Sequence, residues 1–210
     1  AVTRGAPTAF VIGDMPFLSY QVSREEAVRN AGRFMQEAGT DAVKLEGGIV
    51  MADTVRAIVN AGIPVMGHIG LTPQSISSLG GFKAQGRSAE TAFRLIEDAE
   101  ALEAAGAFSI LLEAIPPEIS RIITEKARIP IISIGAGLPC DGQLLIVHDM
   151  LGFFDRFTPK FVKKYADLNG AIFQAMQQYK EDVRQQMFPA KEHTYGMPAE
   201  EMEKLLKMLK

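Results

Sequence analysis

Short apolar runs alternate regularly with longer amphipathic stretches along this 210-residue chain, and this alternation constrains the fold more than any other feature. The runs are rich in β-branched residues and have the length of strands, whereas the stretches between them carry apolar residues at helical spacing. Such β-α alternation is typical of a parallel sheet covered by helices. We expect strands at residues 10–14, 41–46, 63–68, 108–113 and 129–134, and a sixth at 160–165.

Helix start and stop residues lie between these strands. Ser23 and Glu26 have the spacing of a capping box that opens a helix, and Gly39 stands where a left-handed residue would end it. Pro117 suits the first turn of a later helix. In chain order, we expect helices at residues 23–38, 50–60, 89–105, 117–127, 141–150, 169–188 and 198–210.

The composition excludes several classes of protein. The chain carries 25 acidic and 22 basic side chains, a net charge of −3, and it has no basic stripe, so we do not expect a nucleic-acid partner. No apolar run reaches the roughly 18 residues of a membrane span, so we expect no membrane partner. Cys140 is the single cysteine and cannot form an internal disulfide, which favours a reducing, cytoplasmic location.

The number of β-α units limits the architecture. Six units are too few for a closed eight-stranded barrel, which takes about 250 residues, so the chain forms either an open, doubly wound sheet or a (β/α)₈ barrel lacking its first two units. Ala1 is not a methionine and stands close to the first apolar run, which favours the second possibility. We expect residues 1–210 to form one N-terminally incomplete barrel domain, with residues 166–210 as a C-terminal helical segment of the same domain.

Ionisable side chains stand at the carboxyl ends of four expected strands: Asp14, Glu46, His68 and Glu113. In parallel α/β proteins, ligands bind at this edge because the following loops converge there. Strand side chains alternate, so Lys44 and Glu46 share one face. Inside a barrel, a cation and a carboxylate are costly unless they pair or bind a ligand, and a purely structural ion pair is the alternative.

Asp14 and Glu46 come from neighbouring strands, so their carboxylates are expected to lie close together. Two hard oxygen ligands suit Mg²⁺, which completes its shell with substrate and water. Taken singly, Asp14 has the alternative role of a turn residue before Pro16, and His68 that of a hydrogen-bonded core histidine.

Glu113 follows three apolar residues and precedes three more residues without charge, surroundings that favour a general base. The alternative is a carboxylate that caps the next helix. The long segment 69–87 is typical of a binding loop, with Gly80-Gly81 as a hinge and Lys83 and Arg87 available to an anionic ligand, or else an ordinary insertion. Gly135-Ala136-Gly137 indicates a tight turn rather than a nucleotide site.

Several of these segments together resemble the ketopantoate hydroxymethyltransferase family. The matching strings are Asp14-Met-Pro-Phe17, Val43-Lys-Leu-Glu-Gly-Gly48, Gly67-His-Ile-Gly-Leu-Thr-Pro-Gln-Ser75, Gly80-Gly-Phe-Lys-Ala-Gln-Gly86, Leu112-Glu-Ala-Ile-Pro116, Ile132-Ser-Ile-Gly-Ala-Gly137, Asp141-Gly-Gln143 and Val147-His-Asp149. The resemblance implies a (β/α)₈ TIM barrel of the phosphoenolpyruvate/pyruvate type that assembles as a homo-oligomer, usually a decamer. It also implies hydroxymethyl transfer from 5,10-methylenetetrahydrofolate to 3-methyl-2-oxobutanoate, giving 2-dehydropantoate for pantothenate synthesis through a magnesium-bound enolate.

The resemblance also implies roles for single residues. Asp14 and Glu46 correspond to metal-site carboxylates, Asp14, Lys44 and His68 to groups that contact the oxoacid, and Glu113 to the catalytic base. The family further has an upstream strand ending in an Asp-Ser pair and a Tyr-Asp motif, which nothing in residues 1–10 supplies.

Two other functions stay open at this point. One is a magnesium-dependent oxoacid lyase or aldolase of the same barrel type, or a metal-free aldolase in which Lys44 forms a Schiff base. The other is a truncated, non-catalytic subunit that assembles with complete copies.

Overall fold

The computed structural model describes residues 1–75, 81, 83–154 and 156–209, and the chain divides into two compact units. The first comprises Ala1–Ile146 with Pro159–Val162, and the second Val147–Thr158 with Lys163–Lys210. The first unit contains the sheet and every candidate site residue.

A six-stranded parallel sheet forms the centre of the first unit, with its strands in the order β1-β2-β3-β4-β5-β6. The five strands expected between residues 10 and 134 are confirmed, with small differences at their ends. The strands are β1 (Ile12–Asp14), β2 (Ala42–Glu46), β3 (Val65–Gly70), β4 (Ser109–Glu113), β5 (Ile131–Ile134) and β6 (Gly142–Gln143).

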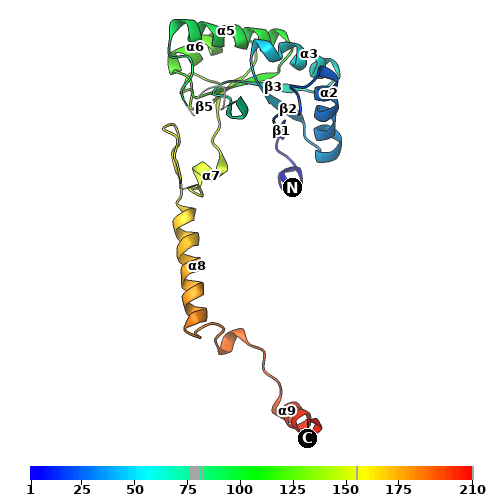
Figure 1. Ribbon diagram of the computed structural model, residues 1–210, viewed down its shortest axis with the longest axis vertical. Coiled ribbons are helices and arrows are strands. Elements are labelled where there is room, and N and C mark those ends of the chain that lie inside the picture. The colour runs from blue at the N-terminus through cyan, green and yellow to red at the C-terminus, as the bar shows by residue number, and fades with distance from the viewer. Residues whose placement is uncertain (76–80, 82, 155, 210) are drawn as a thin grey trace. The chain divides into compact units, whose positions relative to one another are not determined.

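Helices α2 (Arg24–Arg33), α3 (Ala52–Asn60), α5 (Ala89–Ala104) and α6 (Pro117–Lys126) lie along one face of this sheet (Figure 1). The predicted capping of α2 is confirmed, because the Ser23 hydroxyl accepts the Glu26 N–H at 3.1 Å. The helical segment continues as a π turn, η1 (Phe34–Ala38), and ends at Gly39, whose φ of 65° is left-handed as expected. Short elements complete the unit: α1 (Val2–Gly5), η2 (Ile49–Met51) and η3 (Pro73–Ser75).

The sheet separates two apolar clusters. Val43 and Leu45 are fully buried in the larger cluster, which packs against the helices. Met66 and Leu111 belong to a smaller cluster. Met66 is in register with Lys44, and Val43 and Leu45 on either side of Lys44 point to the helices, so Lys44 and Met66 point to the opposite face. The inner face, opposite the helices, is therefore apolar near the start of the strands and polar at their carboxyl ends.

The order of the strands excludes one of the two predicted architectures, the doubly wound sheet. Strands that follow chain order, with helices along one face, form a curled half-barrel rather than a doubly wound sheet (Figure 1). β1 and β6 are its edges within the described residues.

Two sequence predictions near residue 150 are wrong. Residues 160–165 form turns instead of the sixth strand, and the Val162 N–H donates to the Pro159 carbonyl. The sixth strand is β6, inside the stretch expected to be helical from Asp141, and only α7 (Val147–Met150) remains helical. The reason is Asp141: its N–H donates to the Ile131 carbonyl at 2.9 Å and its carboxylate accepts the Ile131 N–H at 2.8 Å, which ties the segment to β5.

The second unit contains α7, α8 (Leu168–Arg184), the short η4 (Lys191–His193) and α9 (Ala199–Met208). The two C-terminal helices expected from the sequence are confirmed, and the Asp167 carboxylate caps α8 by accepting the Gly170 N–H at 3.2 Å. Among the described residues, no helix has both the length and the apolar character that a membrane crossing requires.

Candidate active site

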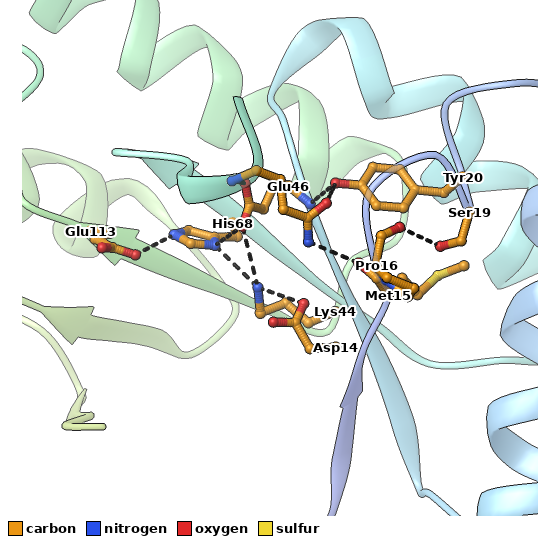
Figure 2. Close-up of polar contacts among 10 residues, drawn as sticks. Asp14, Met15, Pro16, Ser19, Tyr20, Lys44, Glu46, His68 and Glu113 are labelled. Carbon is orange, nitrogen blue, oxygen red and sulfur yellow. Dashed lines mark hydrogen bonds and ion pairs between the residues drawn. The ribbon is translucent and has the colours of Figure 1, made fainter. Parts of the chain in front are cut away.

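The five predicted site residues form one cluster on the inner face, at the carboxyl end of the sheet (Figure 2). Strand register brings them together, since Asp14 pairs with Lys44 across β1 and β2, and Glu46 pairs with His68 across β2 and β3. Glu113 ends β4, the next strand.

Lys44 is the centre of the cluster. Its Nζ lies 2.9 Å from Asp14 Oδ1, 3.2 Å from His68 Nδ1 and 4.0 Å from Glu46 Oε1. The Glu46 side chain is only 4% exposed, whereas that of Asp14 is 60% exposed. The Lys44 ammonium thus links the buried Glu46 carboxylate to the Asp14 carboxylate, which solvent or a ligand can reach. Lys44 and Glu46 are therefore not an isolated structural ion pair.

His68 joins Lys44 to Glu113. Since the Lys44 ammonium can only donate, His68 Nδ1 accepts and the ring proton is assigned to Nε2. Nε2 lies 3.1 Å from Glu113 Oε2 without forming a hydrogen bond to it, and this buried nitrogen has no hydrogen-bond partner in the described part of the chain. A buried donor without a partner is costly, so His68 is not a fully hydrogen-bonded core histidine.

The Glu46 carboxylate presents two different oxygens. Oε2 accepts the backbone N–H of Gln74 at 3.0 Å, while Oε1 faces His68 Nδ1 at 3.7 Å and Lys44 Nζ at 4.0 Å. Burial raises the pKa of Glu46, and the Lys44 ammonium and the Gln74 N–H oppose that rise.

Glu113 closes β4 without capping α6. The N-cap residue of α6 is Pro116, and no side chain caps that helix end. Ala114, directly after Glu113, has a φ of 50°, which strains a residue other than glycine. This turn redirects the chain immediately after the carboxylate, and the capping alternative for Glu113 finds no support.

Tyr20 and Gln74 belong to the same cluster, and neither was predicted. The Tyr20 hydroxyl accepts the Glu46 N–H at 3.2 Å and donates to Gln74 Oε1 at 2.9 Å. Burial raises the pKa of Tyr20 to about 12. Tyr20 lies in an irregular loop and Gln74 in a short 3₁₀ turn, where no periodicity marks a residue as facing a site.

The donor set can be compared with what a metal ion requires. Among the described residues, no group of three or more His, Cys, Asp and Glu side chains could hold a metal. Asp14 and Glu46, however, both face the position of a cation, the Lys44 ammonium. Mg²⁺ commonly takes one or two protein carboxylates and fills its other positions with substrate and water, so these residues fit an open magnesium site.

The other predicted binding features contribute less. Gly135 and Gly137 have φ values of 73° and 90°, and the Ala136 N–H between them donates to Ser133 Oγ, which is the expected tight turn. Lys83 and Arg87 are exposed. Of the predicted hinge, Gly81 has a φ of 109° and Gly80 lies outside the described residues.

A sequence profile of the ketopantoate hydroxymethyltransferase family matches residues 1–191 of the chain. The chain belongs to the ketopantoate hydroxymethyltransferase family. A relative from Oleidesulfovibrio alaskensis, named 3-methyl-2-oxobutanoate hydroxymethyltransferase, is 58% identical over 96% of this chain and 70% of its own length. A protein of the same name from Syntrophomonas wolfei is 56% identical over 97% of this chain and 74% of its own length.

Among solved structures, a phosphonopyruvate hydrolase matches with a TM-score of 0.49 and 11% identity, covering 94% of this chain and 68% of that chain. The family membership agrees with the resemblance found in the sequence motifs. It does not by itself assign a role to any of the five site residues.

Proposed function

We propose that the chain transfers a hydroxymethyl group from 5,10-methylenetetrahydrofolate to 3-methyl-2-oxobutanoate, forming 2-dehydropantoate. The observation that carries this proposal is the 58% identity, over 96% of the chain, to a relative named for this activity. The clustered ionisable groups at the carboxyl end of a curled parallel sheet support it, since that edge is the usual location of catalytic groups in such folds.

Glu113 is the proposed catalytic base. It removes the proton at C3 of the oxoacid, and the electron pair left on C3 attacks the methylene carbon of the folate. One folate C–N bond breaks as this C–C bond forms, and water then displaces the second folate nitrogen from the same carbon. The products are the hydroxymethyl group and tetrahydrofolate, whose two nitrogens take the proton from C3 and one proton from water. His68 Nε2, a buried donor without a hydrogen-bond partner in the described residues, is available to an oxygen of the bound oxoacid. Lys44 offsets the negative charge that the oxoacid carries and that grows as the proton leaves.

Asp14 and Glu46 are the residues that would hold Mg²⁺. When bound, the ion supplies a Lewis acid that polarises the keto group and makes the C3 proton more acidic. The exposed Asp14 carboxylate is accessible from solvent, whereas the buried Glu46 carboxylate is held in place by its neighbours.

We also propose that further strands close the half-barrel into a (β/α)₈ barrel of the phosphoenolpyruvate/pyruvate type. Open sheet edges leave backbone groups unpaired, and closure of the barrel removes them. Assembly into a homo-oligomer such as a decamer, a cytoplasmic location, and membership of residues 166–210 in the same domain remain part of this proposal.

Schiff-base chemistry at Lys44 is not favoured. The Lys44 Nζ lies 2.9 Å from a carboxylate, which stabilises the ammonium, and an ammonium is not a nucleophile. Borohydride reduction in the presence of the oxoacid would leave the mass of the protein unchanged under our proposal. Under the alternative it would add the mass of the substrate less one oxygen atom, because imine formation releases water and the reduction adds two hydrogen atoms.

The activity is tested by following 2-dehydropantoate formation from the two substrates in the presence of Mg²⁺. The assay uses two proteins: the 210-residue chain, and the same chain preceded by the residues that come before the matched region in the O. alaskensis relative. Product from either protein supports the proposal. Cleavage of the oxoacid without folate would favour a lyase, and a lack of any reaction in both proteins would favour a non-catalytic subunit.

A further inference from the structure

We propose that Tyr20 and Gln74 are positioning residues that hold the Glu46 carboxylate and determine which of its two oxygens faces Lys44. This inference rests on the proposed function, in which Glu46 is a metal-site carboxylate. Neither residue touches the cluster's cation, Lys44, and both act through Glu46.

Gln74 binds three partners from three parts of the chain. Its backbone N–H donates to Glu46 Oε2 at 3.0 Å, its side-chain NH₂ donates to the Met15 carbonyl at 2.9 Å, and its Oε1 accepts from the Tyr20 hydroxyl at 2.9 Å. Because the amide accepts on one side and donates on the other, its orientation is defined by its partners. The turn after β3 is thereby fastened both to the end of β1 and to Glu46.

Tyr20 completes the connection. Its hydroxyl accepts the Glu46 N–H at 3.2 Å (Figure 2). The same hydroxyl donates to Gln74, whose backbone N–H in turn binds the Glu46 carboxylate. The side chain is only 1% exposed. A phenylalanine would fill nearly the same volume, so packing explains the ring of Tyr20 but not the position of its hydroxyl.

The result is a carboxylate with one oxygen occupied and one directed to the site. Oε2 is hydrogen-bonded to Gln74, and Oε1 faces Lys44 and His68 with no hydrogen bond to any residue that the structure describes. If the hydrogen bond from Gln74 were lost, the Glu46 carboxylate could rotate, and either of its oxygens could then face Lys44. Groups that orient metal-binding side chains typically contribute 10–100-fold to metal affinity.

The experiment measures the Mg²⁺ dissociation constant by calorimetry, and kcat and KM for the oxoacid, in whichever of the two protein lengths forms product. The variants are Tyr20→Phe, Gln74→Met and the double variant, with Glu46→Gln as the reference for a lost carboxylate. We expect each single variant to weaken Mg²⁺ binding about 10-fold and to raise KM more than it lowers kcat. The double variant should be little worse than either single one, because both break the same connection.

Two matched variants serve as controls. Gln143→Met removes a similar hydrogen bond, from a glutamine amide on the edge strand β6 to the Gly137 carbonyl. Tyr179→Phe removes a hydroxyl from an exposed tyrosine in the second unit. Both should bind Mg²⁺ like the parent protein. Gln74→Met keeps the inference testable if Tyr20→Phe fails to fold.

The outcomes separate this inference from the proposed function. If the parent forms product and binds Mg²⁺, Glu46→Gln loses the metal, and the Tyr20 and Gln74 variants bind it normally, the inference is overturned and the function stands. The inference is also overturned if the two control variants lose as much Mg²⁺ affinity as the Tyr20 and Gln74 variants, because the loss would then not depend on the contacts to Glu46. A parent that neither forms product nor binds Mg²⁺ overturns both.

Discussion

At the scale of the residue, the site depends on short contacts among polar and charged side chains. Lys44, His68 and Glu113 form a continuous line of polar contacts from β2 to β4. Each group restricts its neighbour: the ammonium assigns the histidine proton, and the histidine presents that proton beside the proposed base. The chemistry of each residue therefore follows from the cluster and not from its type alone.

The role of Glu113 can be isolated with Glu113→Gln, which keeps the shape of the side chain and removes the base. We expect turnover to fall about 10²–10⁴-fold while oxoacid binding is largely retained. Exchange of the C3 proton of the oxoacid in deuterated water, followed by NMR, measures the step itself. Exchange at the parent rate in the variant would exclude Glu113 as the base.

Tyr20 predicts a pH dependence at the alkaline end. Its pKa in the folded chain is about 12 against an ordinary value of 10.0, so between these pH values the unfolded chain loses a proton that the folded chain keeps. The Tyr20 contribution to stability is therefore complete below pH 10 and declines as the pH rises toward 12.

Two measurements check this dependence. The difference in absorbance at the tyrosinate band between the parent and Tyr20→Phe should titrate with a midpoint near pH 12. The urea midpoint of the parent should fall more steeply above pH 10 than that of the variant. A difference spectrum with a midpoint near pH 10 would contradict the prediction.

At the scale of the element, a capping side chain marks where α2, α5 and α8 begin. α5 opens with a reciprocal cap, in which the Ser88 hydroxyl accepts the Thr91 N–H at 3.3 Å and Thr91 Oγ1 accepts the Ser88 N–H at 3.0 Å. The helix then buries Leu95 and Leu102 against the sheet. The cap and the buried stripe together set the position of α5 on the outer face.

Ser88→Ala should destabilise the chain by about 1 kcal/mol, because the Thr91 N–H loses its side-chain acceptor. Ser88→Asn provides the matched control, since asparagine is also a good capping residue and should retain most of the stability. Chemical denaturation measures both variants. Equal loss in Ser88→Ala and Ser88→Asn would show that the hydroxyl acts through something other than the cap.

The stretch from Asp141 to Met150 shows where local signals fail. Its pattern predicts a helix, but β6 forms because Asp141 bonds to both backbone groups of Ile131 on β5. The edge strand thus forms because of hydrogen bonds to a residue ten positions away. The secondary-structure propensity of the segment itself does not reflect such a contact.

At the scale of the whole molecule, the half-barrel is open at β1 and at β6 within the described residues. Its inner face carries Met66 and Leu111, and its edges carry strand backbone. Open edges of this kind pair with other chains, whereas a closed barrel has none.

We expect the 210-residue chain alone to aggregate or to turn over poorly, and the chain preceded by the upstream residues of the O. alaskensis relative to form a compact oligomer with high activity. Light scattering measures the mass of each protein, and product formation with Mg²⁺ measures its activity. A soluble and equally active 210-residue chain would overturn the proposal that further strands complete the barrel and its site.

From the sequence alone, the alternation of strands and helices, the cap of α2, and the identity of the ionisable groups at the strand ends could be determined. These features depend on neighbours within a few residues, or on a period of 2.0 or 3.6, and both are readable in one dimension. The family motifs likewise lie within short segments.

Only the tertiary structure decided how those groups meet. Register across β1, β2 and β3 places the Lys44 ammonium between Asp14 and Glu46. It also leaves His68 Nε2 beside Glu113 with no hydrogen-bond partner among the residues that the structure describes. The connection from Tyr20 to Gln74 joins residues 54 positions apart. Such contacts arise from the packing of loops onto the end of a folded sheet, where distance in space no longer follows distance along the chain.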